Sequence, residues 1–272
     1  MRTVDGLRLL CVAAHPDDES LGFGGTLAQA ATEGVEVSLV VATRGERGRH
    51  GDGTEPHPGP EALGRIREAE VRAACDVLGV RNLRFLDYLD GDLDQADPDE
   101  ASARIALLVR ELRPQVVITF DPFGAYGHPD HVAISQLTVA AVLRAASAEP
   151  IVGDEQGPHR VAKLYYMANT ERRWSAFQRA LKALQMTVDG GVRTAISWPD
   201  WSVTTTVDAF DRWETVWRAV QCHRTQMAQY GALTRLTPED HRVLWGTQEY
   251  YRAFSLVNGG RARESGLFEG IR

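Results

Sequence analysis

The stretch LRLLCVAA at residues 7–14 is an apolar run broken by a single arginine, and the cluster HPDDE follows it at residues 15–19. Such a run is typical of a strand that is buried on both faces of a parallel sheet. In open α/β sheets, ligands gather outside the carboxyl ends of the strands. The sequence therefore predicts a functional site directly after its first strand.

The rest of the first half alternates between strand and helix patterns. Strands are predicted at 35–42, 80–86 and 115–120, and helices at 20–33, 61–78, 97–112 and 129–146. This alternation predicts an α/β fold of the Rossmann-like type, with a mostly parallel sheet and helices on both faces. A second cluster, HPDH at 128–131, follows the strand at 115–120, so both clusters are expected at the same edge of the sheet.

The second half of the chain is less regular. Strands are predicted at 161–168, 202–207 and 250–257, and helices at 170–186 and 209–230. Residues 1–150 are expected to form a Rossmann-like catalytic core that carries both clusters. Residues 151–272 are expected to continue or cap this core and to complete the substrate cleft, within one structural domain.

Composition narrows the function classes. The chain has 272 residues and a formal net charge of −7, which argues against a nucleic-acid partner because such a partner needs a basic face. No apolar stretch reaches the roughly 20 residues of a membrane span, and residues 1–7 do not resemble a secretion signal. The three isolated cysteines are expected to be reduced. We therefore expect a cytoplasmic protein that acts on a small molecule; a homo-oligomer is compatible with the sequence.

The two clusters offer ligands for one metal ion. Zinc binds imidazole nitrogen and carboxylate oxygen, and a catalytic site keeps three protein ligands so that water can hold the fourth position. His15 and Asp18 lie three residues apart, and His131 can be the third ligand if the fold brings the clusters together. These ligand types do not separate Zn²⁺ from Fe²⁺ or another divalent ion. Helix capping would explain the acids alone, but not the second His-Pro-Asp sequence.

Five short motifs lie in and beyond these clusters. They are AHPDDE at 14–19, TRGE at 43–46, REAE at 67–70, DPFGAYGHPDH at 121–131 and HRTQ at 223–226. With them the chain resembles the LmbE-like, or PIG-L, family of zinc-dependent N-deacetylases. The tyrosine-bearing loop before the second cluster is most similar to the branch that deacetylates the glucosaminyl-inositol precursor of mycothiol.

The resemblance implies that His15, Asp18 and His131 bind the metal and that Asp17 is the general base. The residues themselves support this division, because zinc lowers the pKa of bound water to about 7 and a carboxylate that is not a ligand can take the remaining proton. By resemblance, Tyr126 is a donor near the tetrahedral intermediate, and simple loop packing is the alternative.

Four further residues are candidates for catalytic or substrate-binding roles: His128, Asp130, Arg67 and His223. His128 can stabilise the developing oxyanion or protonate the leaving amine, and Asp130 is expected to orient an imidazole, His128 in the first place. The resemblance suggests that Arg67 contacts a substrate hydroxyl or phosphate and that His223 reaches toward the site. On the sequence alone, Arg67 belongs to a solvated helix face with ion pairs, and His223 is a satisfied surface histidine.

The function predicted from these residues is hydrolysis. Hydroxide bound to the metal would remove the acetyl group from an N-acetylated amino sugar or an N-acetylglucosaminyl conjugate. The alternative on the same site is an amidase that cleaves a thiol-conjugate amide; a non-catalytic metal- or sugar-binding module ranks below both. Dinucleotide chemistry is disfavoured because Leu27 occupies the third glycine position after Gly22 and Gly24. Close packing against a strand explains the glycines better.

Overall fold

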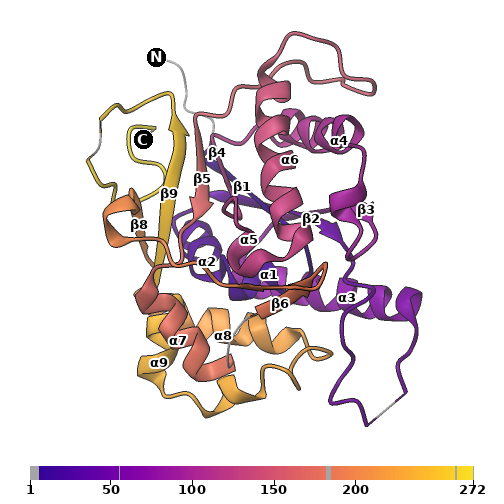
Figure 1. The fold of residues 1–272 in the computed structure, drawn as a ribbon. Helices are drawn as coiled ribbons and strands as arrows, with labels where there is room; N and C mark the ends of the chain where they lie inside the picture. The colour runs from indigo at the N-terminus through magenta and orange to yellow at the C-terminus, as the bar shows by residue number, and fades with distance from the viewer. Residues whose placement is uncertain (1–5, 55, 182–184, 261, 272) are drawn as a thin grey trace.

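The apolar run near the N-terminus forms β1 (Arg8–Ala13), an interior strand that is buried from Leu9 onward. The computed structural model describes residues 6–54, 56–181, 185–260 and 262–271. Its main sheet has seven strands in the order β3-β2-β1-β4-β5-β9-β8 (Figure 1). The pairings from β3 through β5 are parallel, whereas β9 pairs antiparallel with both β5 and β8. The predicted α/β fold with a mostly parallel sheet is confirmed.

The elements of the first half match the expected alternation. The strands are β2 (Glu36–Thr43), β3 (Asn82–Tyr88) and β4 (Val116–Thr119). The helices are α1 (Asp18–Leu21), α2 (Gly24–Thr32), α3 (Pro60–Leu78), α4 (Pro98–Leu112), α5 (Gly124–Gly127) and α6 (Pro129–Ala146). The single helix expected at 20–33 is thus two helices, α1 and α2.

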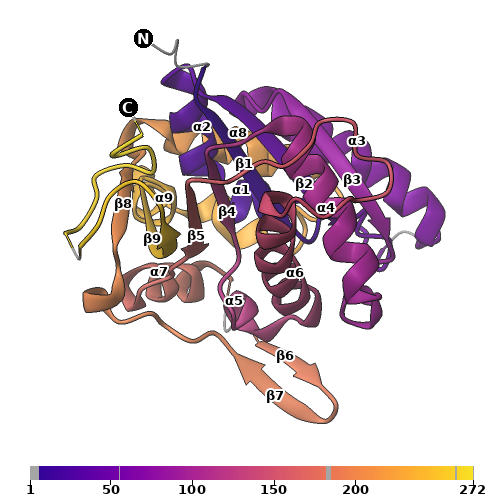
Figure 2. The ribbon, with the colours of Figure 1, turned by 90° about the horizontal axis from the view of Figure 1, so that it is seen from above.

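The second half continues the same sheet. The second half adds to this sheet the strands β5 (Lys163–Met167), β8 (Thr205–Asp208) and β9 (Thr247–Ser255). The α-helices of the second half are α7 (Glu171–Leu181), α8 (Trp213–Cys222) and α9 (Pro238–Trp245). Helices α4 and α6 pack together on one face, and α2, α3 and α8 pack on the other (Figure 2). Among the described residues, no helix is both long and apolar enough to cross a membrane.

A β-hairpin replaces part of an expected helix. The helix predicted at 170–186 ends with α7, and β6 (Gln185–Val188) pairs with β7 (Gly191–Thr194) beyond it; residues 182–184 lie outside the described residues. Asp189 and Gly190 both have positive φ, at 51° and 78°, as a two-residue hairpin turn of the I′ type requires. The Asp-Gly sequence was the local signal for this turn.

The long helix predicted at 209–230 is also wrong in its extent. A short 3-10 helix at Phe210–Arg212 leads into α8, and α8 ends before His223, which is fully buried against the first half of the chain. Helix α9 was not predicted, although its start carries a capping box in which Thr237 and Asp240 bond reciprocally. Helix α8 thus ends where His223 becomes buried, and α9 begins at a capping box that the sequence itself shows.

Close packing explains the glycines after the first strand. A Cβ atom on Gly25 would lie 2.4 Å from the carbonyl oxygen of Trp245, and one on Gly24 would lie 2.9 Å from a methyl group of Val216. Both neighbours lie in helices, α9 and α8, so the close approach is mainly between helices. Close packing explains both glycines, but the expected packing against a strand is wrong in its partner: only Gln248 of β9 is a strand neighbour, 3.0 Å from a Cβ on Gly25.

Candidate active site

The site begins where β1 ends. The chain turns after Ala14, and the backbone N–H groups of Ala14 and His15 donate to Asp18 Oδ2 at 3.1 and 2.8 Å. These bonds hold the Asp18 carboxylate against the end of the strand. The second cluster lies at the start of α6, which follows β4. There the His131 ring stacks on Phe120, with ring centres 4.0 Å apart.

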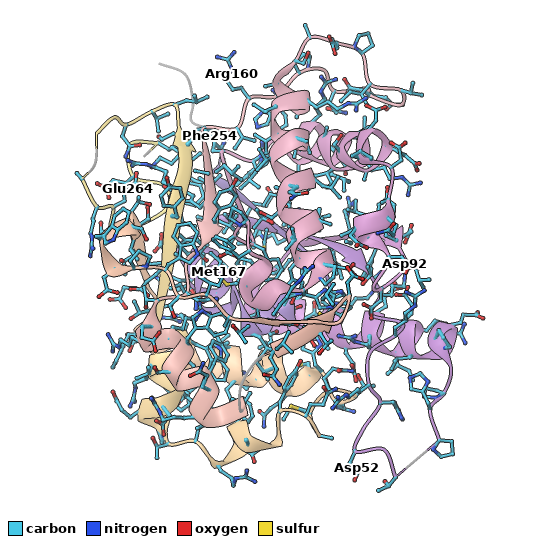
Figure 3. All side chains as sticks on the ribbon, viewed as in Figure 1. Asp52, Asp92, Arg160, Met167, Phe254 and Glu264 are labelled. Carbon is cyan, nitrogen blue, oxygen red and sulfur yellow. The ribbon has the colours of Figure 1, made fainter. Side chains whose placement is uncertain are left out.

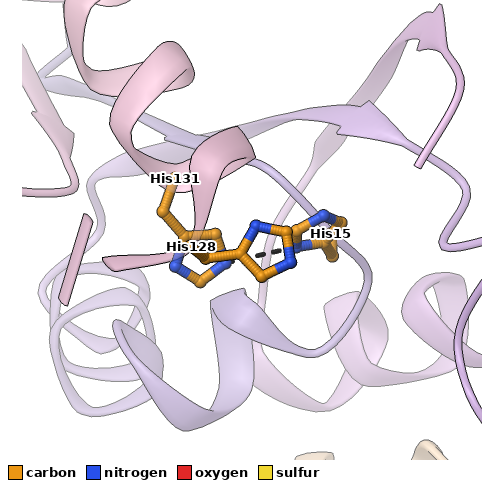
Figure 4. A group of neighbouring side chains, drawn as sticks. All are labelled: His15, His128 and His131. Carbon is orange, nitrogen blue, oxygen red and sulfur yellow. Dashed lines mark hydrogen bonds between the residues drawn. The ribbon is translucent and has the colours of Figure 1, made fainter. Parts of the chain in front are cut away.

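The two clusters converge, as Figure 4 shows for their histidines. His15 Nδ1 lies 3.2 Å from His131 Nε2 and 3.8 Å from Asp18 Oδ2, and His131 Nε2 lies 3.5 Å from Asp18 Oδ1. Two ligand atoms of a tetrahedral zinc ion, each about 2.0–2.1 Å from the metal, are separated by roughly 3.4 Å. His15, Asp18 and His131 therefore fit one divalent ion.

His128 lies close to this group. Its ring nitrogens come within 4.8 Å of ligand atoms of His15 and His131, so these three histidines are a second possible ligand set. We favour Asp18 as the third ligand because backbone N–H groups fix its carboxylate at the end of β1. His128 Nδ1 instead accepts the backbone N–H of Asp130, at 3.1 Å, and caps α6.

Two carboxylates lie behind His15. Its Nε2 is 3.0 Å from Asp130 Oδ2 and 3.2 Å from Asp90 Oδ1. Asp130 is fully buried and also accepts the backbone N–H groups of Gly91 and Leu93. The expectation that Asp130 orients His128 is wrong: its carboxylate orients His15, in the carboxylate–histidine arrangement common at metal sites.

Three groups fix Asp17, the predicted base. Its backbone N–H donates to Glu19 Oε2 at 2.9 Å, and its φ of 110° lies in the left-handed region. Arg67 Nη2 donates to Asp17 Oδ2 at 3.1 Å, and the Tyr230 hydroxyl donates to the same oxygen at 2.8 Å. Both side-chain donors therefore bond to Oδ2, and neither of them bonds to Oδ1 of Asp17.

Arg67 is not on a solvated helix face. It is 4% exposed, and besides Asp17 it donates to the carbonyl oxygens of Gly45 and Pro16. The interpretation as part of a solvated ion-pair face is wrong for this residue. Its guanidinium lies behind Asp17, where its contacts hold the carboxylate in place.

His223 lies beneath the same turn and is fully buried. Its Nε2 is 2.7 Å from Glu19 Oε1, and this glutamate is also fully buried. Burial lowers the pKa of His223, but the charge and hydrogen bond of Glu19 outweigh burial and raise it. The surface-histidine interpretation is wrong. His223 reaches the site through Glu19, whose other oxygen holds Asp17.

Tyr126 lies in the loop before α6 and faces two of the histidines. Its ring centre is 5.4 Å from that of His131 and 6.1 Å from that of His128, in edge-to-face contacts. Ala125 beside it has φ 62° and ψ −75°, and its backbone N–H donates to Asp121 Oδ1. The loop is thus held in an unusual conformation that keeps Tyr126 beside the ligand group.

A cavity of about 130 Å³ opens next to these residues. Its polar lining from the first half includes Asp17, Asp18, Tyr126 and His131, and the second half contributes Tyr230 and residues of β5 and α7. Both halves of the chain therefore form its walls.

Comparison with known proteins places the chain in a family. Residues 10–142 match the family model PIG-L, described as GlcNAc-PI de-N-acetylase. A 1D-myo-inositol 2-acetamido-2-deoxy-alpha-D-glucopyranoside deacetylase from Kineococcus radiotolerans is 38% identical, over 97% of this chain and 83% of the relative. The chain belongs to the PIG-L family.

Another relative and a solved structure are also similar to this chain. A mycothiol S-conjugate amidase from Streptomyces coelicolor is 32% identical to this PIG-L chain, over 98% of each protein. The crystal structure of a conserved protein from Thermus thermophilus superposes with a TM-score of 0.64 at 28% identity, covering 94% of this chain and 99% of that one. The solved structure supports the fold of this PIG-L protein over nearly its whole length.

Three residues that complete the site, Asp90, Glu19 and Tyr230, were not predicted from the sequence. Asp90 follows β3 at the same sheet edge as the two clusters, so its position after a parallel strand was an available signal. Glu19 was counted only as an adjacent acid, and its bonds to Asp17 and His223 depend on the fold. Tyr230 lies in a segment that was predicted as helix, and nothing in its local pattern indicated the contact with Asp17.

The pKa values of His15 and Asp18 predict that a cation bound to them would displace protons. Burial lowers the pKa of His15, but hydrogen bonds to Asp130 and Asp90 outweigh burial and raise it to about 10. Burial raises the pKa of Asp18 to about 7. Because both groups must be deprotonated to bind a cation, zinc affinity is expected to rise with pH throughout the range below the pKa of His15, by about tenfold per unit from His15 and more steeply below the pKa of Asp18.

Competition with a chelator of known pH dependence, at half-unit steps from about pH 5.5 to 8, measures this affinity. Proton release can be checked by calorimetry in buffers of different ionisation enthalpy. A corrected affinity that does not change with pH would contradict the expectation.

Loss of the buried pair under Asp17 is expected to destabilise the fold. Replacing His223 with Ala leaves the fully buried Glu19 without its cationic partner, so the free energy of unfolding should fall by about 3–5 kcal/mol. Urea denaturation measures the change, and His57→Ala, at an exposed loop position, is the matched control. A loss no greater than that of the control would show that the pair does not support the turn.

Proposed function

We propose that this protein is a metal-dependent N-deacetylase that hydrolyses the acetamide of an N-acetylglucosaminyl conjugate. The observation that carries the proposal is the convergence of His15, Asp18 and His131 within 3.8 Å, next to a carboxylate that is not part of the ligand group. The chain is a member of the PIG-L family, and its relative from Kineococcus radiotolerans is named as a deacetylase of a glucosaminyl-inositol.

His15, Asp18 and His131 would hold the metal, which we propose is zinc. When bound, such an ion lowers the pKa of water and polarises a carbonyl group. Asp130 accepts at His15 Nε2 and so leaves Nδ1 of that ring available as the ligand atom. The residues after position 150 are proposed to complete the substrate cleft.

Asp17 would act as the general base. Arg67 and Tyr230 both donate to Oδ2, so Oδ1 is the oxygen that can accept the proton of the attacking water. Glu19 fixes the backbone of Asp17 from below. A positioned carboxylate of this kind needs no rearrangement before it takes the proton.

His128 and Tyr126 would face the developing oxyanion. Burial is the main cause that lowers the pKa of His128 to about 4, so this imidazole is neutral at pH 7. Because its Nδ1 accepts from the backbone of Asp130, its hydrogen lies on Nε2, where it can be donated. The Tyr126 hydroxyl is proposed as a second donor.

The test is amide hydrolysis by the zinc-loaded protein, measured as the free amine that is released. N-acetylglucosaminyl-inositol, simpler N-acetylglucosaminides and S-conjugated amides are compared at equal concentration, with chelator-treated protein as the control. Hydrolysis of the acetylated glycosides supports the proposal. Cleavage of the S-conjugated amides alone would favour the second candidate, an amidase, which the name of the Streptomyces coelicolor relative suggests. No metal-dependent hydrolysis of either class would overturn both.

A further inference from the structure

The cavity beside Asp17 is larger than an acetyl group needs. Its volume of about 130 Å³ is close to the roughly 150 Å³ of an apolar cavity that holds a benzene ring. Most of its wall is apolar, and the apolar side chains come from α1, β5, α7 and the loop after β4: Leu21, Phe120, Met167, Trp174 and Phe177. Figure 3 labels Met167, at the end of β5 in the middle of the molecule.

Two buried polar side chains in the same cavity have atoms that find no partner among the described residues. Arg173 is 3% exposed, and its Nε and Nη1 donate to no described group. Asn169 is 5% exposed, and its Oδ1 accepts from no group in the described part of the chain. Leaving a buried polar atom unpaired costs about 1–3 kcal/mol, and more for a charged group. A ligand in the cavity would remove this cost.

The guanidinium of Arg173 is held in place without an ion pair. Its Nη2 donates to the carbonyl oxygens of Gly22 and Leu21, at 2.8 and 3.3 Å. No carboxylate among the described residues lies within ion-pair distance of it, and burial lowers its pKa to about 10 although Glu249 and Tyr250 raise it. Arg173 therefore stays charged at neutral pH and has free donors, which suits a carbonyl or carboxylate oxygen.

We propose that this cavity is a subsite for the acyl part of the substrate amide, and that it accepts acyl chains longer than acetyl that end in a carboxylate or a carboxamide. The methylene groups would lie along the apolar wall, and the terminal oxygen would accept from Arg173. A carboxamide would also donate to Asn169 Oδ1. A sugar is a poor occupant, because its hydroxyl groups would lie unpaired against the apolar wall.

This inference rests on the proposed function and extends its acyl scope. In the reaction, the oxygen of water bonds to the carbonyl carbon and the C–N bond breaks. The acyl chain leaves as a carboxylic acid that gives up its proton, and the amine takes one. The subsite changes only which acyl chain is presented to Asp17 and the metal ligands.

The test uses four amides of one amine, methyl α-glucosaminide, with the zinc-loaded full-length protein. The acyl groups are acetyl, pentanoyl, succinyl and succinamoyl. We expect kcat/KM for at least one of the two carbonyl-ended chains to exceed that for pentanoyl by about tenfold or more, which corresponds to about 1.4 kcal/mol. A higher value for succinyl would assign the subsite to anions, and a higher value for succinamoyl to amides.

Variants connect the preference to the two side chains. Arg173→Met and Asn169→Asp are each expected to bring kcat/KM for the carbonyl-ended chains close to that for pentanoyl, so that the ratio of the two is near one. Asn169→Asp keeps the arginine but places a carboxylate in the subsite. Arg172→Met is the matched control, because Arg172 is exposed one residue away on α7. If Arg173→Met does not fold, Asn169→Asp still decides the outcome.

Three results would overturn the inference in different ways. Hydrolysis of the acetyl amide without any preference for carbonyl-ended chains over pentanoyl would remove the subsite and leave the proposed function intact. A preference that persists in both variants would place the recognition elsewhere. No hydrolysis of the four amides by protein that cleaves N-acetylglucosaminyl-inositol would overturn the subsite alone; no hydrolysis of either would overturn the proposed function, and the subsite with it.

Discussion

Replacement of Asp17 by Asn is expected to lower kcat for acetate release by about 10³-fold while zinc remains bound, because general acid–base catalysis contributes about 10²- to 10⁴-fold. The amide keeps the shape of the carboxylate but cannot take the proton of the attacking water. The contacts of Asp17 with Arg67 and Tyr230 engage only Oδ2, so the carbonyl oxygen of the asparagine can keep both of them.

Zinc content, measured by mass spectrometry of the purified variant, separates loss of the base from loss of the metal. KM should change much less than kcat, since Asp17 is proposed to act on the water and not on the bound sugar. Asp76→Asn, an exposed position on α3, controls for the removal of one negative charge. If Asp17→Asn retains full activity with zinc bound, Asp17 is not the base.

Replacement of His131 by Ala is expected to remove both the metal and the activity. His15 and Asp18 alone would not hold a divalent ion against micromolar chelator, because a catalytic zinc site needs three protein ligands. Loss of the charge stabilisation that a metal supplies, several kcal/mol, should lower kcat/KM by about 10³-fold or more. The His131 ring also stacks on Phe120, so thermal unfolding of the variant should be measured beside the apo wild type.

The matched control is again His57→Ala, since His57 is exposed and lies outside the ligand group. The decisive measurement is the number of zinc ions bound per chain after dialysis. A variant that still binds one zinc ion with wild-type affinity would exclude His131 as a ligand, and with it both sets that contain this histidine; it would favour the group of His15, Asp90 and Asp130.

Local sequence patterns predicted the sheet of the first half well. The apolar runs at β1, β2 and β4 are fully or almost fully buried, so each is apolar on both faces and readable without the fold. The helices and strands of the second half were predicted less accurately, because they are short and partly exposed. There, the ends of α7 and α8 are determined by a hairpin turn and a buried histidine.

The site was predictable where it depends on chain position relative to the strands. His15 and His131 both follow interior parallel strands, and the carboxyl ends of such strands share one edge, so the clusters had to meet there. The partner of Asp130 was not predictable in this way. His128 is two residues from Asp130 and His15 is 115 residues away, yet the carboxylate bonds to the distant imidazole.

The sequence by itself determined the fold class, the sheet edge that carries the site and the residues that can bind a metal there, because these follow from apolar periodicity and from residue types next to strand ends. Only the tertiary structure decided what holds Asp17 in place. Arg67 and Tyr230 reach it from 50 and 213 residues away, and His223 supports it through Glu19. Such contacts depend on how distant side chains pack, and no local pattern in the chain specifies that packing.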